Sequence, residues 1–160
     1  MTKRTEIEPV LIAGGGIGGL AAALGLAKGG YRVIVLEKAQ DRGEIGAGIQ
    51  LGPNAFHAFD YLGVGEAARS IAVYIDELRL MDALTGADIT TIDLGEAFRA
   101  RFGNPYAVVH RGDLHGVLLS ACRADPRIDL RVSSQVEGYD QDGESVTVRL
   151  VEGELVTGAA

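Results

Sequence analysis

The sequence has little cysteine and little proline, and it has no block of basic residues. Cys122 is the single cysteine among 160 residues, so a disulfide framework is excluded. With only four prolines and no three-residue glycine period, a collagen-like chain is also excluded. Residues 61–160 carry nine basic and sixteen acidic side chains, which accounts for the net charge of −7, so we expect no binding to nucleic acid. The lone thiol fits a reducing compartment, and we expect a cytoplasmic protein.

Glycine, in contrast, is abundant. There are 23 glycines, and 14 of them fall within the first 65 residues. Apolar residues make up 47% and charged residues 23% of the chain, which is typical of a globular domain with a buried core. Residues 10–27 carry no charge, but they contain six glycines and follow Glu6 and Glu8. A signal peptide or membrane span of this composition is disfavoured, and we expect no membrane association.

The first 75 residues alternate between strand and helix patterns. The apolar residues 10–13 predict a buried strand, and apolar positions at helical spacing follow from Ile17 until Gly29 and Gly30. Residues 32–36 predict a second strand, which completes a βαβ unit in about 30 residues. A glycine-containing loop over 43–52, a helix from Pro53 to Gly63 and a helical turn over 65–71 follow.

The pattern of residues 76–160 predicts mostly antiparallel strands. Residues 76–94 alternate with a period of two around a Thr85-Gly86 turn, and 106–109 predict another short strand. A helix with Asp113 at its N-terminus carries apolar residues as far as Cys122. Strands are expected near 130–132, 136 and 146–150, with a turn at Asp142-Gly143, and a last strand begins at Leu155.

Gly14-x-Gly16-x-x-Gly19 lies between the first strand and the first helix. Gly14 permits the tight turn, Gly16 lets the backbone approach a pyrophosphate, and Gly19 lets the helix lie close to the strand. The helix N-terminus offers free N–H groups and a positive dipole to the anion. Glu37 lies 18 residues after Gly19, close to the spacing of a carboxylate that binds the adenosine ribose. The pattern predicts a dinucleotide-binding site.

Two alternatives to this interpretation stay open from spacing alone. A glycine-rich turn without a ligand would explain the glycine pattern alone. It would not explain the second strand and the acidic residue that follow the pattern. An NAD-dependent dehydrogenase shares the fingerprint, but it should continue with further helices and parallel strands. Residues 76–94 and 129–156 favour hairpins instead. Glu37 would repel a 2′-phosphate, which argues against NADP at this position.

Four segments carry a more specific pattern, namely residues 14–19, 33–38, 44–55 and 110–115. Together they resemble the single-component FAD-dependent aromatic-ring hydroxylases. Within that family, they are most similar to the hydroxylases of salicylate and of 3-hydroxybenzoate. The resemblance implies a Rossmann-like FAD-binding βαβ unit with inserted antiparallel strands. It also implies these cofactor-binding residues: Gly14, Gly16, Ile17, Gly18, Gly19, Glu37, Lys38, Ala47, Gly48, Arg111 and Val136.

The resemblance assigns parts of the cofactor to this set. The glycine loop, with backbone from Ile17 and Gly18, would hold the pyrophosphate, and Glu37 the ribose. Gly46, Ala47 and Gly48 would run beside the flavin, Arg111 would reach the phosphate or ribitol, and Val136 would offer backbone to the adenine. From spacing alone, Arg111 is equally well a surface residue paired with Asp113.

The resemblance further implies an enzyme in which NADH or NADPH reduces FAD and dioxygen hydroxylates a small phenolic or benzoate-type aromatic. We expect residues 1–75 to form the βαβ unit and the flavin loop, and residues 76–105 to form the first strands of a substrate-side sheet. Residues 106–160 are expected to form the FAD-binding helix and a β-meander. The family carries an Asp-Gly motif after the strand that begins near Leu155, and this sequence stops before it. We expect an incomplete domain, the N-terminal part of a larger enzyme. A natural short form and a stretch without activity of its own are the alternatives.

No catalytic acid or base stands out. His57, His110 and His115 have no metal-ligand spacing with cysteines or paired acids, and we expect no metal. His57 is expected to be a packing or surface residue, and His110 and His115 are expected to be structural. Cys122 falls on the apolar face of its helix, so we expect it to be buried and inert.

Overall fold

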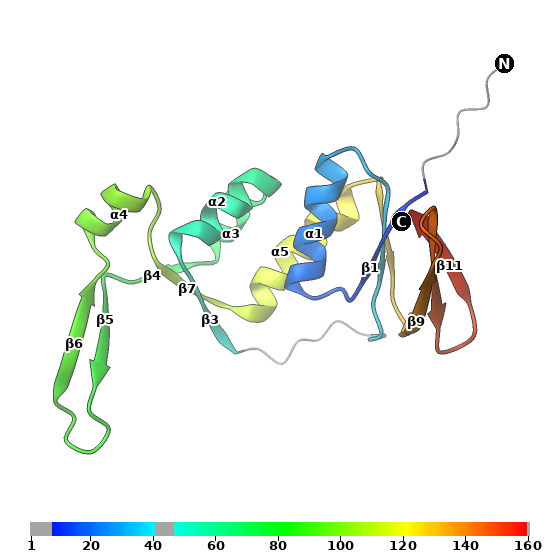
Figure 1. The fold of residues 1–160 in the computed structure, drawn as a ribbon. Coiled ribbons are helices and arrows are strands. Elements are labelled where there is room, and N and C mark those ends of the chain that lie inside the picture. The colour runs from blue at the N-terminus through cyan, green and yellow to red at the C-terminus, as the bar shows by residue number, and fades with distance from the viewer. Residues whose placement is uncertain (1–7, 41–46, 160) are drawn as a thin grey trace. The chain divides into compact units, whose positions relative to one another are not determined.

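The computed structural model describes residues 8–40 and 47–159, and the chain divides into two compact units (Figure 1). The first unit comprises Met1–Gly43 and His115–Ala160, and the second comprises Glu44–Leu114. The boundary at Leu114 falls inside helix α5 (Arg111–Ala124). Within the described residues, no helix combines the length and the apolar character needed to cross a membrane.

The first unit is built on a parallel sheet in the order β1-β2-β8. Its strands are β1 (Val10–Ala13), β2 (Val33–Leu36) and β8 (Ile128–Arg131). Helix α1 (Ile17–Lys28) connects β1 to β2, so the predicted βαβ unit is confirmed. The helix ends where expected, at Gly29, and Gly30 adopts a positive φ of 91° that suits glycine.

The central strand β2 is buried on both faces because different layers cover it. Ile34 and Leu36 pack with Val148, Leu150 and Val156 of an antiparallel meander. Val33 and Val35 alternate with them and face the opposite side of the sheet. Figure 1 shows α1 on one side of β1 and strands β9 and β11 on the other. The meander has the order β11-β10-β9, and its strands are β9 (Val136–Gln141), β10 (Ser145–Leu150) and β11 (Leu155–Ala159).

The second unit contains a small antiparallel sheet and a separate hairpin. The sheet has the order β3-β7-β4, and the hairpin pairs β5 with β6, as the period-two pattern predicts. Phe56, Phe59, Ala68 and Val109 are buried in its core. Its elements are β3 (Gly48–Leu51), α2 (Pro53–Leu62), α3 (Gly65–Ser70), β4 (Val73–Tyr74), β5 (Glu77–Met81), β6 (Asp88–Asp93), α4 (Glu96–Phe102) and β7 (Ala107–His110).

Two local expectations were wrong, and one helix was missed. Residues 48–51 form strand β3 rather than loop, because they pair with β7, and no local pattern signals this pairing. Helix α4 was not predicted, since seven residues between Gly95 and Gly103 offer little periodicity. Helix α5 begins at Arg111 and not near Asp113. The Arg111 N–H, which a helix leaves unpaired in its first turn, donates to the Ala47 carbonyl at 3.0 Å, so the helix can follow β7 directly.

Candidate functional site

The loop between β1 and α1 has the backbone geometry that its glycines predict. Gly14 adopts a φ of 103°, and its N–H donates to the Leu36 carbonyl at 2.7 Å, which ties the loop to β2. A Cβ on Gly19 would overlap the Gly14 carbonyl oxygen and would lie 3.4 Å from Ile12 Cγ2. Gly14 is therefore required by conformation, and Gly19 by the close approach of the helix to the loop.

Within the described residues, the N-terminus of α1 has open space around it. Gly16 is the N-cap residue, and no side chain caps the helix there. The first N–H groups of a helix have no partner within it and carry its positive dipole end. A Cβ added at Gly16 or at Gly18 would meet no heavy atom of residues 8–40 and 47–159 within 4 Å. This helix end is suited to bind an anion through backbone N–H groups.

Glu37 follows β2 and reaches the glycine loop. Its Oε1 accepts the Ala39 N–H at 2.8 Å, and its Oε2 accepts the Gly15 N–H at 2.6 Å. These hydrogen bonds, the one from Ala39 first, and the nearby Lys38 charge hold the pKa of Glu37 below its ordinary value, although partial burial opposes them. Glu37 is thus a carboxylate at neutral pH, and its remaining lone pairs can accept hydroxyl groups.

A cavity of about 320 Å³ lies beside this carboxylate. It brings together four of the predicted cofactor residues, Gly14, Glu37, Lys38 and Val136. Ser134 and Gln135 also line it, and neither was predicted. The Ser134 N–H donates to the Glu37 carbonyl at 2.8 Å, which fixes the start of the meander against the end of β2. The hint in the sequence was only that both residues immediately precede Val136.

His115 contacts the glycine loop, which agrees with the structural role expected for it. Its side chain is buried, and its Nε2 lies 2.8 Å from the Gly15 carbonyl oxygen. The two residues are 100 positions apart, so no local spacing could have indicated the contact.

Gly16, Ile17, Gly18 and Gly19 lie at the start of α1 in the first unit, and the three remaining predicted cofactor residues, Ala47, Gly48 and Arg111, lie in the second unit. Ala47 accepts the Arg111 N–H, and Gly48 pairs with His110 in the first register position of β3 and β7. Arg111 is exposed, as are Ala47 and Gly48. Gly46, which was expected to run beside the flavin, lies outside the described residues.

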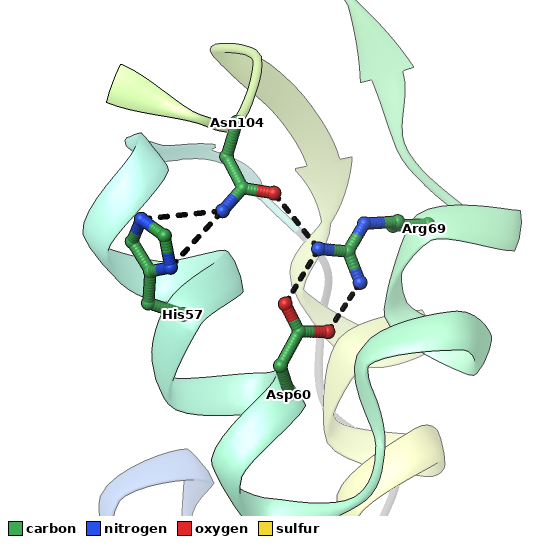
Figure 2. A network of polar contacts seen from close by, with 4 residues as sticks. All are labelled: His57, Asp60, Arg69 and Asn104. Carbon is green, nitrogen blue, oxygen red and sulfur yellow. Dashed lines mark hydrogen bonds and ion pairs between the residues drawn. The ribbon is translucent and has the colours of Figure 1, made fainter. Parts of the chain in front are cut away.

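A separate polar network occupies the second unit (Figure 2). Arg69 donates to both carboxylate oxygens of Asp60, at 2.5 and 2.8 Å, and to Asn104 Oδ1 at 2.8 Å. Asn104 Nδ2 lies 3.3 Å from His57 Nδ1. The hydrogen bonds and charge of Arg69 lower the pKa of Asp60. The network ties α2, α3 and the turn after α4 to one another, which is a structural role, as expected for His57.

The two remaining sequence expectations concern Cys122 and metal binding. Cys122 is fully buried, as predicted, and its Sγ lies 3.4 Å from the Leu20 carbonyl. Among residues 8–40 and 47–159, no group of three or more His, Cys, Asp or Glu side chains is placed to hold a metal ion.

A parallel βαβ unit with a glycine loop at its first turn and a carboxylate after its second strand defines a dinucleotide-binding domain. The antiparallel meander on the far face of its sheet distinguishes it from a doubly wound dehydrogenase domain. The chain belongs to the FAD-binding domain family, which matches it over residues 8–157.

Curated relatives and solved structures agree with this assignment. The chain is 51% identical over 150 residues to 3-hydroxybenzoate 6-hydroxylase 1 of Aquipseudomonas alcaligenes, a match that covers 94% of this chain and 38% of that protein. It is 58% identical over 140 residues to 3-hydroxybenzoate 6-hydroxylase of Polaromonas naphthalenivorans, covering 88% of this chain and 35% of the relative. The structure of p-nitrophenol 4-monooxygenase PnpA from Pseudomonas putida superposes with a TM-score of 0.78 at 29% identity, covering 94% of this chain and 38% of that one. The chain thus spans little more than a third of the length of these proteins.

The first unit fits FAD, the cofactor of the family. The space in front of Gly16 and Gly18 would be narrowed by any side chain, and a pyrophosphate can approach the helix N-terminus there. The ionised Glu37 at the edge of the cavity suits ribose hydroxyls and disfavours a 2′-phosphate. When bound, FAD supplies redox chemistry that amino-acid side chains lack.

Proposed function

We propose that this chain is the FAD-binding part of a flavoprotein monooxygenase that hydroxylates a small phenolic carboxylate, with 3-hydroxybenzoate as the first candidate substrate. The observation that carries the proposal is the identity of 51% and 58% to two proteins named 3-hydroxybenzoate 6-hydroxylase. In the proposed reaction, the aromatic, dioxygen, NADH or NADPH and a proton give the hydroxylated aromatic, water and the oxidised nicotinamide.

The proposed cofactor contacts fall into two groups, one in each unit of the chain. In the first unit, the loop from Gly14 to Gly19, with the N–H groups of Ile17 and Gly18, holds the pyrophosphate. Glu37 and its neighbour Lys38 hold the ribose, and the backbone at Val136 faces the adenine. In support, Gly14, Glu37, Lys38 and Val136 line one cavity.

In the second unit, we propose that Ala47 and Gly48 pass beside the flavin and that Arg111 contacts the phosphate or ribitol. The hydrogen bond from the Arg111 N–H to the Ala47 carbonyl supports a common role for these residues. Arg111 is an exposed residue at the start of α5, and a guanidinium group suits a phosphate oxygen. The division into residues 1–75, 76–105 and 106–160 stays a prediction, and so does a cytoplasmic location.

In this proposal the described residues bind and orient the cofactor and exclude water from it, and none of them carries a proton in the chemical step. Glu37 remains ionised because backbone N–H groups stabilise its charge, so it acts as a hydrogen-bond acceptor. The acids and bases of the reaction are expected outside these residues.

The test uses the longest chain that the gene encodes, purified and loaded with FAD. NADH and NADPH oxidation would be followed with 3-hydroxybenzoate, salicylate or 4-hydroxybenzoate, and the products identified by mass spectrometry and NMR. Hydroxylation of carbon 6 of 3-hydroxybenzoate gives 2,5-dihydroxybenzoate, and this product should form with one dioxygen consumed per nicotinamide oxidised. A flavoprotein that converts none of these aromatics would overturn the proposed substrate class. A protein that binds NAD but no FAD would overturn the whole proposal.

A further inference from the structure

The Gly15 peptide groups are held from both sides by side chains that lie far away in the sequence. The Gly15 N–H donates to Glu37 Oε2 at 2.6 Å, and the Gly15 carbonyl lies 2.8 Å from His115 Nε2. Gly15 is buried, and His115 is only 5% exposed. We propose that His115 is a positioning residue for FAD: through the Gly15 carbonyl, it sets the direction of the Gly16 N–H that meets the pyrophosphate.

The link from His115 to the Gly16 N–H is the peptide plane. The Gly15 carbonyl and the Gly16 N–H belong to one trans peptide, so they point in opposite directions. A hydrogen bond that holds the carbonyl toward α5 therefore turns the N–H away from α5. In the described part of the chain, this N–H donates to no other backbone group, which leaves it available to an anion at the end of α1.

The hydrogen bond has a defined donor. A carbonyl oxygen only accepts, so the proton must be on Nε2 of His115. The ring is buried on the same helix as Cys122, whose Sγ approaches the Leu20 carbonyl in α1 at 3.4 Å. Contacts at both positions hold α5 beside α1, so the imidazole is in place before a ligand arrives. Binding then requires no further ordering of this side chain.

A histidine that served packing alone would act differently on two quantities. Its replacement would lower the free energy of unfolding, and it would lower the amount of FAD bound only because less protein is folded. A positioning histidine affects the FAD dissociation constant of molecules that are already folded. The inference depends on FAD binding and not on the hydroxylation proposed above, so a protein that binds FAD but hydroxylates no tested aromatic still tests it.

The experiment compares four variants of the longest chain that the gene encodes. His115→Gln keeps an N–H donor near the position of Nε2, whereas His115→Asn is too short and His115→Leu has no donor. Cys122→Ala is the matched control, because it removes a buried contact between the same two helices without touching the loop. FAD dissociation constants would be measured by flavin fluorescence on the apoproteins. Urea unfolding would be measured in parallel, and the ³¹P NMR signals of bound FAD recorded.

We expect the FAD dissociation constant to rise about tenfold in H115N and H115L, and by less than about threefold in H115Q and C122A. The pyrophosphate signals should shift in the first pair only. Equal affinity in H115L and the wild type would overturn the proposal, and so would an H115Q variant as weak as H115N. If H115N and H115L both fail to fold while H115Q folds, the role of His115 lies in folding, and the proposal is also wrong.

Discussion

The two polar centres of this chain are built in opposite ways. In the first unit, the side chains of Glu37 and His115 hold backbone atoms of the glycine loop. In the second unit, Arg69 holds the side chains of Asp60 and Asn104, and its guanidinium carbon lies 5.3 Å from the centre of the Phe56 ring. The second centre thus joins side chains to one another. The first centre instead fixes the backbone of the glycine loop, and the N-terminus of α1 that follows has no side-chain cap among the described residues.

Because of this difference, we expect one centre to contribute mainly to the stability of the fold and the other mainly to ligand binding. A network whose polar groups satisfy one another stabilises the fold and leaves little capacity for a ligand. A loop that is held by side chains at Gly15, and whose helix N-terminus has no side-chain cap among the described residues, is prepared for a ligand that supplies the missing partner. Substitutions in the two centres should therefore have separable effects, and the following predictions test that separation.

The largest effect is expected for Gly19→Ala. The new Cβ would overlap the Gly14 carbonyl oxygen, so α1 must move away from the loop. We expect the free energy of unfolding to fall by about 3 kcal/mol and FAD binding to be lost with it. Urea unfolding and a flavin titration measure both. Gly18→Ala is the control for the free energy of unfolding, because its Cβ meets no heavy atom of the described residues within 4 Å and alanine favours the helix; an equal loss of stability in both variants would contradict the prediction.

Asn104→Ala should reduce stability and leave FAD binding unchanged. Asn104 is 7% exposed, and its removal takes an acceptor from Arg69 and a partner from His57. We expect a loss of about 1–2 kcal/mol in the free energy of unfolding. Asn54→Ala, on the exposed side of α2, should change it by less than about 0.5 kcal/mol. A weaker affinity for FAD in folded N104A would show that the two centres are not separate.

Gly16→Ala should show the reverse behaviour. The backbone at Gly16 suits any residue, with φ −72° and ψ 179°, and no heavy atom of the described residues lies within 4 Å of the new Cβ. We expect a cost in stability below about 1 kcal/mol, since alanine is a poorer N-cap than glycine. The FAD dissociation constant should nevertheless rise at least about tenfold, because the Cβ occupies the space of the pyrophosphate. Unchanged affinity would place the cofactor elsewhere.

The smallest effect concerns the pH dependence of Glu37. Its pKa is lower in the folded protein than its ordinary value of 4.5, so its contribution to stability is present above pH 4.5. The contribution is lost as the pH falls from 4.5 through the lowered pKa. The stability difference between the wild type and Glu37→Gln should therefore shrink between pH 6 and pH 3 in urea titrations. Other acids titrate in both proteins and cancel, so a difference that stays constant would contradict this account.

Much of the fold was predictable because its signals are local. The apolar run of β1, the helical spacing from Ile17 and the acid at Glu37 identified the βαβ unit correctly. The turn residues Gly63 and Gly143 adopt the positive φ values that their positions predicted. Strand β3 and helix α4 were missed, since the first depends on its partner β7 and the second is too short to show a period.

By itself, the sequence determined the glycine loop, the carboxylate that follows β2 and the order of hairpins after them. These features depend on backbone conformation and on side-chain periodicity within a few residues. Only the tertiary structure decided that His115 meets Gly15, across 100 residues, and that Asn104 joins His57 to Arg69. A polar side chain in a helix or turn has many possible partners, and the packing of distant elements selects one of them.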